Sequence, residues 1–291
     1  MTLSTVNPFR LAASAFYRIA YKLHHKLFLR PQPPLRIPVF IVGSYLAGGA
    51  GKTPFTIWLA KRILEQNRKV AVLCHRKAWD EFTLLQQELQ PLGATVIATT
   101  NRHATAKTIA NKFDAILCDD GFEDTRFTGA CNICLDWQEP PHSITDLFPA
   151  GKCRSLAQDH HDSQIIHIDC YGKNGTFPDI SFSIESLTNY SSEVPLAATA
   201  VCGLGTPERF IEDLRTFGIN IEKTIIRPDH DKLFFQAVQG ELSQGKHVVV
   251  SQKDACRLPQ SLLANPSLHT TVQKITVSEK TQKIIDRAIH S

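Results

Sequence analysis

A glycine-rich stretch, "SYLAGGAGKTPF" at residues 44–55, leaves this chain few choices of fold. It directly follows the apolar run "VFIVG" and precedes a helical pattern over residues 53–66. A loop between a buried strand and a helix can bind phosphate, because its backbone amides and the helix N-terminus face the anion. The common pattern G-x-x-x-x-G-K-[ST] would place a glycine where this chain has Leu46. We still expect a nucleotide site, formed by Gly48, Gly49, Ala50, Gly51, Lys52 and Thr53.

A second stretch, "AILCDDGFED", has the chemistry that a nucleotide site needs beside its glycine loop. Four apolar residues lead into Asp119 and Asp120, which therefore end a predicted strand. Ligands of open α/β sheets bind at that edge, and carboxylates there can hold Mg²⁺ directly or through water. We expect Lys52 to neutralise ATP phosphates, and Thr53, Asp119 and Asp120 to hold Mg²⁺. The alternative for this segment is a solvated turn, since Asp-Gly is common in turns.

Alternating strands and helices predict an α/β fold. The expected strands of the first domain are "VFIVG", "KVAVLC", "ATVIATT", "FDAILCDD" and "CNICLD". Helical stretches between most of them predict a P-loop-type, mostly parallel sheet flanked by helices. Short polar extended pieces at residues 172–196 suggest a linker, after which a smaller α/β domain follows. Its expected elements are strand 198–205, helix 206–218, strand 223–230, helix 231–242, strand 247–255 and a final helix at 278–291.

Residues 7–29 have the period of an amphipathic helix with a basic face. Its charges interrupt the apolar run too often for a membrane span. The chain has no acidic residue before Glu65, whereas basic residues recur from Arg10 to Arg36. These features favour a helix lying in an anionic membrane interface over an ordinary helix packed on its own domain. The expected division is therefore a membrane-facing helix at 1–30, a nucleotide-binding domain with linker at 31–195 and a smaller domain at 196–291.

Composition narrows the class of protein further. A hydrophobic fraction of 43% and a charged fraction of 21% are ordinary for a globular protein, and a net charge of +4 does not imply nucleic acid. Several of the eight cysteines lie in apolar runs, so we expect them to be reduced. Cys131 and Cys134 form a C-x-x-C inside a predicted strand, with no second pair to complete a zinc site. With no evident secretory signal, the expected compartment is the cytoplasm.

Seven short segments, in order along nearly the whole chain, resemble the tetraacyldisaccharide 4′-kinase family of lipid A synthesis. "VGSYLAGGAGKTP" is similar to the family's V-G-N-L-T-V-G-G-T-G-K-T-P loop, which also lacks the first glycine of the common pattern. "WDEFTLL" resembles G-D-E-P-L-L-L, "DDGFED" resembles D-D-G-L-Q-H and "FPAGKCRS" resembles L-P-A-G-x-L-R-E. "CGLGTPERF", "RPDH" and "SQKDACRL" resemble A-G-I-G-N-P-E-R-F, F-P-D-H and T-E-K-D-A-V-K.

The resemblance implies an ATP-dependent kinase that phosphorylates the 4′-hydroxyl of a tetraacyldisaccharide 1-phosphate. It implies ATP and Mg²⁺ as cofactors, and a peripheral location on the cytoplasmic face of the inner membrane, where the basic helix would contact anionic lipid. On matching positions, Asp80 would be the general base and His230 its partner. The two would have to face one cleft with the glycine loop. The alternative is that Asp80 caps its helix and His230 the next turn, far apart.

The chain departs from the family pattern at several positions. The family's R-G-Y-G-R segment is shortened to "HRKAWDE", in which Arg76 would retain part of its role. Glu123 and Asp124 replace a Gln and a His beside the expected metal, and Ser155 replaces a Glu. Arg76, Glu123 and Asp124 are the candidates for substrate contact. Two alternatives stay open: a membrane-associated nucleotide-binding protein without kinase activity, and a regulatory P-loop ATPase.

Overall fold

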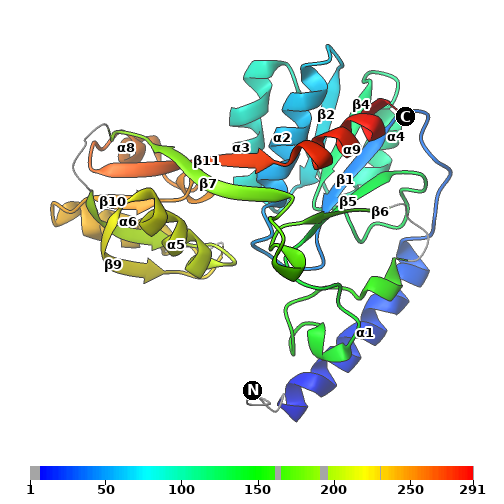
Figure 1. Cartoon of the computed structure of the whole chain (residues 1–291), viewed down its shortest axis with the longest axis horizontal. Helices are drawn as coiled ribbons and strands as arrows, with labels where there is room; N and C mark the ends of the chain where they lie inside the picture. The colour runs from blue at the N-terminus through cyan, green and yellow to red at the C-terminus, as the bar shows by residue number, and fades with distance from the viewer. Residues whose placement is uncertain (1–6, 161–164, 191–195, 230, 291) are drawn as a thin grey trace. The chain divides into compact units, whose positions relative to one another are not determined.

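The computed structural model describes residues 7–160, 165–190, 196–229 and 231–290. The chain divides into two compact units, the first formed by residues 1–180 with 277–291 and the second by residues 181–276. Figure 1 shows the elements of both.

The first unit is built on a six-stranded sheet in the order β3-β2-β4-β1-β5-β6. Every neighbouring pair in it is parallel. Its strands are β1 (Val39–Gly43), β2 (Val70–His75), β3 (Thr95–Thr99), β4 (Ala115–Asp119), β5 (Cys131–Asp136) and β6 (Ile165–Asp169). The expected parallel sheet and its first five strands are confirmed, and β6 is an edge strand that the sequence patterns did not predict.

Helices cover this sheet because nearly all residues of its central strands β1, β2 and β4 are apolar and buried, whereas the edge strands β3 and β6 are more exposed. The helices are α2 (Lys52–Leu64), α3 (Trp79–Leu89) and α4 (Arg102–Ile109), with short 3₁₀ turns at Gln90–Leu92, Ile144–Asp146, Ala157–Asp159 and Lys173–Gly175. Ala106 of α4 packs with Ile41 and Leu73 in one core cluster. Phe40 and Val42 alternate with Ile41 and so face the other way, where they are also buried.

The second unit contains a five-stranded sheet in the order β7-β11-β10-β8-β9. Its strands are β7 (Ile180–Leu187), β8 (Ala197–Cys202), β9 (Asn220–Ile226), β10 (Val248–Val250) and β11 (Leu268–Val277). Its helices are α5 (Pro207–Phe217), α6 (Phe234–Ser243), α7 (Gln252–Ala255) and α8 (Gln260–Leu263). Phe210 of α5 packs with Ala200, whereas Val238 of α6 packs with Val201, so helices cover both faces. This confirms a smaller α/β part of the chain.

Two details of the second part differ from the sequence patterns. The segment expected as a linker contains the eight-residue strand β7, because its polar residues alternate with buried ones at the edge of a sheet. The expected strand at 247–255 stops at Val250, since the Ser251 hydroxyl accepts a hydrogen bond from the Asp254 amide and caps a helical turn. The last helix, α9 (Glu279–His290), belongs to the first unit, where Asp286 forms a bidentate ion pair with Arg62 of α2.

The N-terminal helix α1 (Pro8–Phe28) begins at Asn7, whose side chain accepts a hydrogen bond from the Phe9 amide. It attaches to the first unit through polar side chains: the Ser14 hydroxyl bonds the Leu147 carbonyl at 2.9 Å and the Tyr17 hydroxyl bonds the Arg154 carbonyl at 2.9 Å. None of the described helices is long and apolar enough to cross a membrane. Six large apolar side chains of α1 are instead more than half exposed: Phe9, Phe16, Ile19, Leu23, Leu27 and Phe28. Among the leucines of this helix, only Leu11 is partly buried.

Candidate active site

The glycine loop connects β1 to α2, as its sequence predicts. Gly49 and Gly51 have φ values of 70° and 73°, a region that other residues adopt only with strain. Gly51 is the residue just before α2, so its conformation turns the chain into the helix. At the start of the loop, a Cβ on Gly43 would lie 2.1 Å from the Cβ of Phe122, so only glycine lets the two segments approach this closely.

The first half of the loop is held by a distant segment, which explains how it can lack the usual first glycine. The Ala47 amide donates to the Lys152 carbonyl at 2.9 Å, and the Arg154 amide donates to the Tyr45 carbonyl at 2.8 Å. Leu46 therefore sits in a bridge opposite Cys153. An extended residue in such a bridge has no need of a left-handed backbone. The second half is held by Trp137, whose Nε1 donates to the Ala50 carbonyl at 2.9 Å.

The first residues of α2 meet the end of β4 because β1 and β4 are paired neighbours. The Thr53 hydroxyl donates to Asp119 Oδ2 at 2.9 Å, and the Thr56 hydroxyl donates to Oδ1 at 3.0 Å. Asp119 is only 1% exposed, so these hydroxyls satisfy a carboxylate that water hardly reaches. The arrangement places a hydroxyl and a carboxylate together beside the phosphate loop.

Asp120, the next residue, lies between two cations. Lys52 Nζ is 3.4 Å from its Oδ1, and a terminal nitrogen of Arg154 lies 2.9 Å from its Oδ2. The other terminal nitrogen of Arg154 donates to the Ala47 carbonyl at 2.6 Å, so this side chain joins the loop to Asp120. Asp120 has a φ of 54°, which turns it away from the strand direction of Asp119. Arg102 completes the cluster by donating to the Asp119 carbonyl at 2.8 Å.

The environments of the two aspartates separate their pKa values. Burial, followed by the charges of Glu81 and Asp120, raises the pKa of Asp119 to about 7. Burial alone would raise the pKa of Asp120 too, but Lys52 and Arg154 outweigh it and lower that pKa to about 2. Asp120 is therefore a fixed negative charge at neutral pH, whereas Asp119 can take up a proton near pH 7.

The segment expected to bind the acceptor follows β2. Asp80 lies in the first turn of α3 and is fully buried, with Oδ1 accepting a hydrogen bond from the Glu81 amide at 3.0 Å. Ala78 occupies the N-cap position of α3 and forms no side-chain capping hydrogen bond there, whereas Asp80 lies inside the first turn. Arg76 is exposed at the end of β2. His230 lies outside the described residues, so its pairing with Asp80 stays a prediction.

The residues that depart from the family pattern have different surroundings. Asp124 forms a bidentate ion pair with Arg126, at 2.7 Å from both guanidinium nitrogens. Glu123 is partly buried, its Oε1 has no hydrogen-bond partner among the described residues, and burial and then Asp120 raise its pKa. Ser155 is buried and its hydroxyl lies 2.9 Å from His160 Nε2. Of the two added acids, Asp124 has an ion pair, whereas Glu123 has only the more distant charges of Arg154 and Lys52, which oppose the rise of its pKa.

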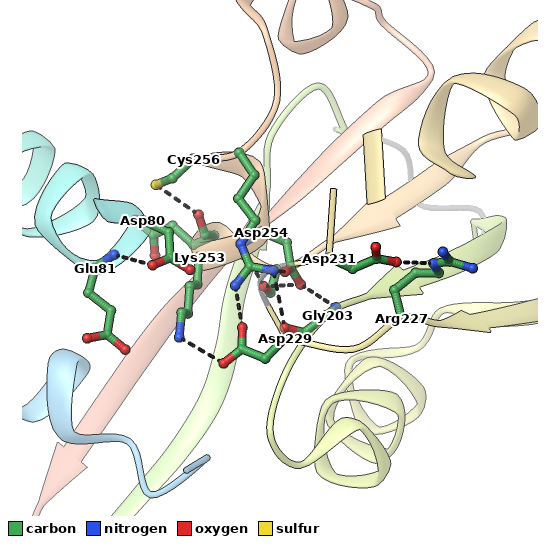
Figure 2. Close-up of polar contacts among 12 residues, drawn as sticks. Asp80, Glu81, Gly203, Arg227, Asp229, Asp231, Lys253, Asp254 and Cys256 are labelled. Carbon is green, nitrogen blue, oxygen red and sulfur yellow. Dashed lines mark hydrogen bonds and ion pairs between the residues drawn. The ribbon is translucent and has the colours of Figure 1, made fainter. Parts of the chain in front are cut away.

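In the second unit, the segments "CGLG", "RPDH" and "SQKDACRL" meet in one polar cluster (Figure 2). Asp254 is fully buried and accepts hydrogen bonds from the Gly203 amide at 3.2 Å and the Ser251 hydroxyl at 2.8 Å. Arg257 pairs with both Asp254 and Asp229, and Lys253 lies 3.8 Å from Asp229. These contacts hold the backbone next to His230.

Sequence reasoning missed three residues that organise the phosphate site: Arg102, Trp137 and Arg154. Arg154 lies within "FPAGKCRS", a segment noted only for its resemblance to the family's L-P-A-G-x-L-R-E. The arginine that both segments share after the glycine was the signal that could have pointed to it. Trp137 and Arg102 had no local signal, because their partners are 87 and 17 residues away.

Comparison with known proteins identifies the family of the chain. The chain matches the model of the "Tetraacyldisaccharide-1-P 4'-kinase" family over residues 7–290. It is 26% identical over 279 residues to the tetraacyldisaccharide 4'-kinase of Chlamydia caviae, covering 80% of this chain and 76% of that protein. It is 28% identical over 282 residues to the Chlamydia trachomatis enzyme of that name, covering 81% and 76%, and 27% identical over 263 residues to that of Histophilus somni, covering 79% and 77%.

The fold has a solved counterpart. The crystal structure described as the "apo" form of LpxK from Aquifex aeolicus in complex with ATP covers 99% of this chain and all of that chain, with a TM-score of 0.63 and 20% identity. At this identity the likeness supports the fold. The match of the family model over nearly the whole length supports more: the chain belongs to the tetraacyldisaccharide-1-P 4'-kinase family.

Proposed function

We propose that this chain transfers the γ-phosphate of ATP to the 4′-hydroxyl of a tetraacyldisaccharide 1-phosphate, a lipid A precursor. Membership of the kinase family supports the reaction. The observation that carries the proposal is the phosphate loop with Lys52 and Thr53 set against Asp120 and Asp119. A second candidate, nucleotide binding without transfer, rests on the departures from the family pattern at Glu123, Asp124 and Ser155, and the family match does not favour it.

The loop residues have distinct parts in this proposal. The amides of Gly48 to Gly51 and the N-terminus of α2 bind phosphate oxygens. When ATP binds, Lys52 leaves Asp120 and contacts the β- and γ-phosphates. Arg154 stays paired with Asp120, so the carboxylate keeps one cation. Oxygen donors on Thr53, Asp119 and Asp120 fit the preference of Mg²⁺ and would hold it. Bound there, Mg²⁺ supplies positive charge that offsets the charge of the transferring phosphoryl group.

The acceptor part of the proposal rests on the family resemblance. Asp80 would take the proton of the attacking hydroxyl, with His230 as its partner, and Arg76 and Glu123 would contact the substrate. Asp124 is a weaker candidate for this contact because Arg126 already occupies its carboxylate. Replacing Asp80 by Asn should lower transfer without lowering ATP affinity, because the amide cannot accept the proton.

The proposal includes binding to the anionic cytoplasmic surface of the inner membrane through residues 1–30. The apolar residues of α1 are exposed along its length, and its basic residues have no acidic neighbours in sequence. An exposed apolar stripe on a basic helix is the arrangement of interfacial helices. Residues 31–180 with 277–291 would then supply nucleotide binding, and residues 181–276 would form the smaller α/β domain.

The test is transfer of radiolabelled phosphate from ATP to a tetraacyldisaccharide 1-phosphate, followed by thin-layer chromatography. Lys52→Ala should nearly abolish transfer, because it removes a charge that faces phosphate and so raises the free energy of the transition state by several kcal/mol. Lys61→Ala, on the same helix, is the matched control because Lys61 pairs with Glu88 at the surface. ATP binding without transfer by the native chain would favour the nucleotide-binding alternative, and unchanged transfer in Lys52→Ala would overturn the site.

A further inference from the structure

Three side chains that can bind a transition metal meet on the β5–β6 edge of the first sheet. Cys134 and Asp136 are two residues apart on β5, so both point to the same face. His167 on β6 pairs in register with Cys134, which puts its side chain on that face too. The thiol, a carboxylate oxygen and an imidazole nitrogen all lie within 4.8 Å of one another.

One oxygen of this group has no nitrogen or oxygen partner among the described residues, although the Cys134 thiol lies close enough to the Asp136 carboxylate to interact with it. Asp136 Oδ1 is buried and has no hydrogen-bond partner among the described residues, while Oδ2 lies 2.8 Å from His167 Nδ1. A buried carboxylate oxygen without a partner costs free energy unless water or an ion satisfies it. Asp136 therefore has an oxygen available within the group that also contains the Cys134 thiol and the His167 imidazole.

The distances suit a small tetrahedral ion. Bonds of about 2.0–2.3 Å to such an ion put ligand atoms about 3.3–3.8 Å apart, so modest side-chain rotations would bring the three atoms to that spacing. Sulfur and imidazole donors favour Zn²⁺ and its neighbours over Mg²⁺, which takes oxygen. We propose that Cys134, Asp136 and His167 bind one divalent transition-metal ion of the Zn²⁺ class, with the fourth position open to water.

This site differs from the two metal patterns considered from sequence. Cys131 lies three residues before Cys134 on the same strand and points to the opposite face, so the C-x-x-C pair does not form it. The oxygen donors beside Lys52 belong to α2 and β4. Burial and then Asp136 raise the pKa of the Cys134 thiol, so a metal ion that binds there must displace the thiol proton to solvent.

The position of the site gives the ion a structural consequence. Cys134 packs in one cluster with Tyr45 of the phosphate loop, and Trp137, next to Asp136, holds the Ala50 carbonyl. An ion bound to β5 and β6 would therefore stabilise the strand that supports the phosphate loop. Because only the folded state brings the three ligands together, binding should raise the melting temperature.

The test uses the full-length chain, reduced and freed of metal with a chelator, in the absence of ATP and lipid. Titration with Co²⁺ should give a saturable thiolate charge-transfer absorption at one ion per chain, and Zn²⁺ should displace it and raise the melting temperature by a few degrees. Neither measurement depends on the proposed kinase activity, so failure of one proposal leaves the other standing.

Two variants and two controls identify the site. His167→Gln should weaken Co²⁺ binding by at least about 10-fold, since losing a ligand costs no less than losing an outer-shell partner. Asp136→Asn should also weaken it. His142→Gln, at another exposed histidine, and Cys131→Ser, on the opposite face of β5, should bind like the native chain. The side chain of His167 is 44% exposed, so its replacement should not prevent folding.

The absence of saturable Co²⁺ binding by the native chain would overturn the proposal. Equal binding by His167→Gln and by the native chain would overturn it as well, because the ion would then lie elsewhere. Loss of the thiolate absorption in Asp136→Asn and His167→Gln, with both proteins still melting cooperatively, would support it.

Discussion

Arg154 donates to the Asp120 carboxylate and to the Ala47 carbonyl, so one side chain links the end of β4 to the phosphate loop. Its own backbone amide bonds Tyr45, which fixes where the side chain starts. With Arg154 on Asp120, Lys52 can move from that carboxylate to phosphate without leaving a partly buried negative charge unpaired. At the residue scale, one carboxylate, that of Asp120, thus pairs with two cations, Lys52 and Arg154.

Arg154→Met should therefore lower kcat/KM for ATP by about 10–100-fold, corresponding to about 1.5–3 kcal/mol for hydrogen bonds to a charged group. The methionine keeps much of the aliphatic bulk, so the loss should come from the charge and its hydrogen bonds. Steady-state transfer assays would measure it, with Arg215→Met at an exposed surface position as control. Equal kinetics for Arg154→Met and the native chain would contradict the bridging role.

Asp119 should give the metal-free protein a characteristic dependence on pH. Its pKa is raised to about 7 by burial, against about 3.9 in an unfolded chain. Between these values the native state holds a proton that the unfolded chain has released. The free energy of unfolding should therefore decrease as pH rises from about 4 to about 7, and this contribution should level off above that.

Asp119→Asn should remove that decline, because an amide is neutral throughout. Urea unfolding at several pH values, without nucleotide or divalent cations, would measure the difference between the two proteins, which should reach a few kcal/mol. Glu212→Gln, at an exposed carboxylate, should keep the native dependence. Parallel curves for the native chain and Asp119→Asn would show that Asp119 is already ionised at low pH.

At the scale of elements, α1 is attached by its polar side and exposed on its apolar side. Ser14 is fully buried, and its hydroxyl both donates to the Leu147 carbonyl and accepts from the Ala150 amide at 3.0 Å. Phe16 and Ile19, in contrast, are 74% and 67% exposed. The orientation reverses that of an ordinary surface helix, whose apolar face is buried.

The double substitution Phe16→Glu with Ile19→Glu should release the protein from anionic vesicles while leaving its melting temperature nearly unchanged. The two side chains contribute apolar area to the membrane interface and little to the fold. Vesicle sedimentation would measure binding, and high salt should weaken binding of the native chain. Leu92→Glu, at an exposed leucine outside α1, is the control. Equal sedimentation of the double variant and the native chain would show that α1 is only structural.

At the scale of the whole molecule, the first compact unit is discontinuous in sequence. The chain leaves the first unit at residue 180, forms the second unit with residues 181–276, and returns to the first with residues 277–291. Arg62 bonds Asp286, and Arg68 donates to the Ile289 carbonyl at 2.6 Å, so the last turn of α2 and the segment that follows it hold α9. Figure 1 shows α9 in red beside the first sheet.

Ile285→Ala should destabilise the first unit by about 2–4 kcal/mol, because Ile285 is fully buried and its removal leaves a cavity. Ile284→Ala is the matched control on the same helix, since Ile284 is 37% exposed and should lose much less. Denaturant unfolding followed by Trp fluorescence would compare them, because Trp58 and Trp137 both belong to the first unit. Similar losses in the two variants would mean that α9 contributes little to that core.

The sequence by itself determined the elements whose pattern is local. The strand, glycine loop and helix at residues 39–64 are encoded within one continuous stretch, as is the period of α1. The family resemblance added the reaction, and the parallel alternation predicted the first five strands. Each of these inferences depends on residues that are neighbours along the chain, within the span that helix and strand periods report.

Only the tertiary structure decided what distant segments do to one another. It set Leu46 against Cys153, gave Arg154 both Ala47 and Asp120, and aligned His167 with Cys134. It also made the polar stretch before residue 190 into the edge strand β7 and turned the apolar side of α1 outward. The physical reason is that strand register and side-chain pairing depend on which surfaces meet after the chain has folded, and periodicity within a segment carries no record of its partner.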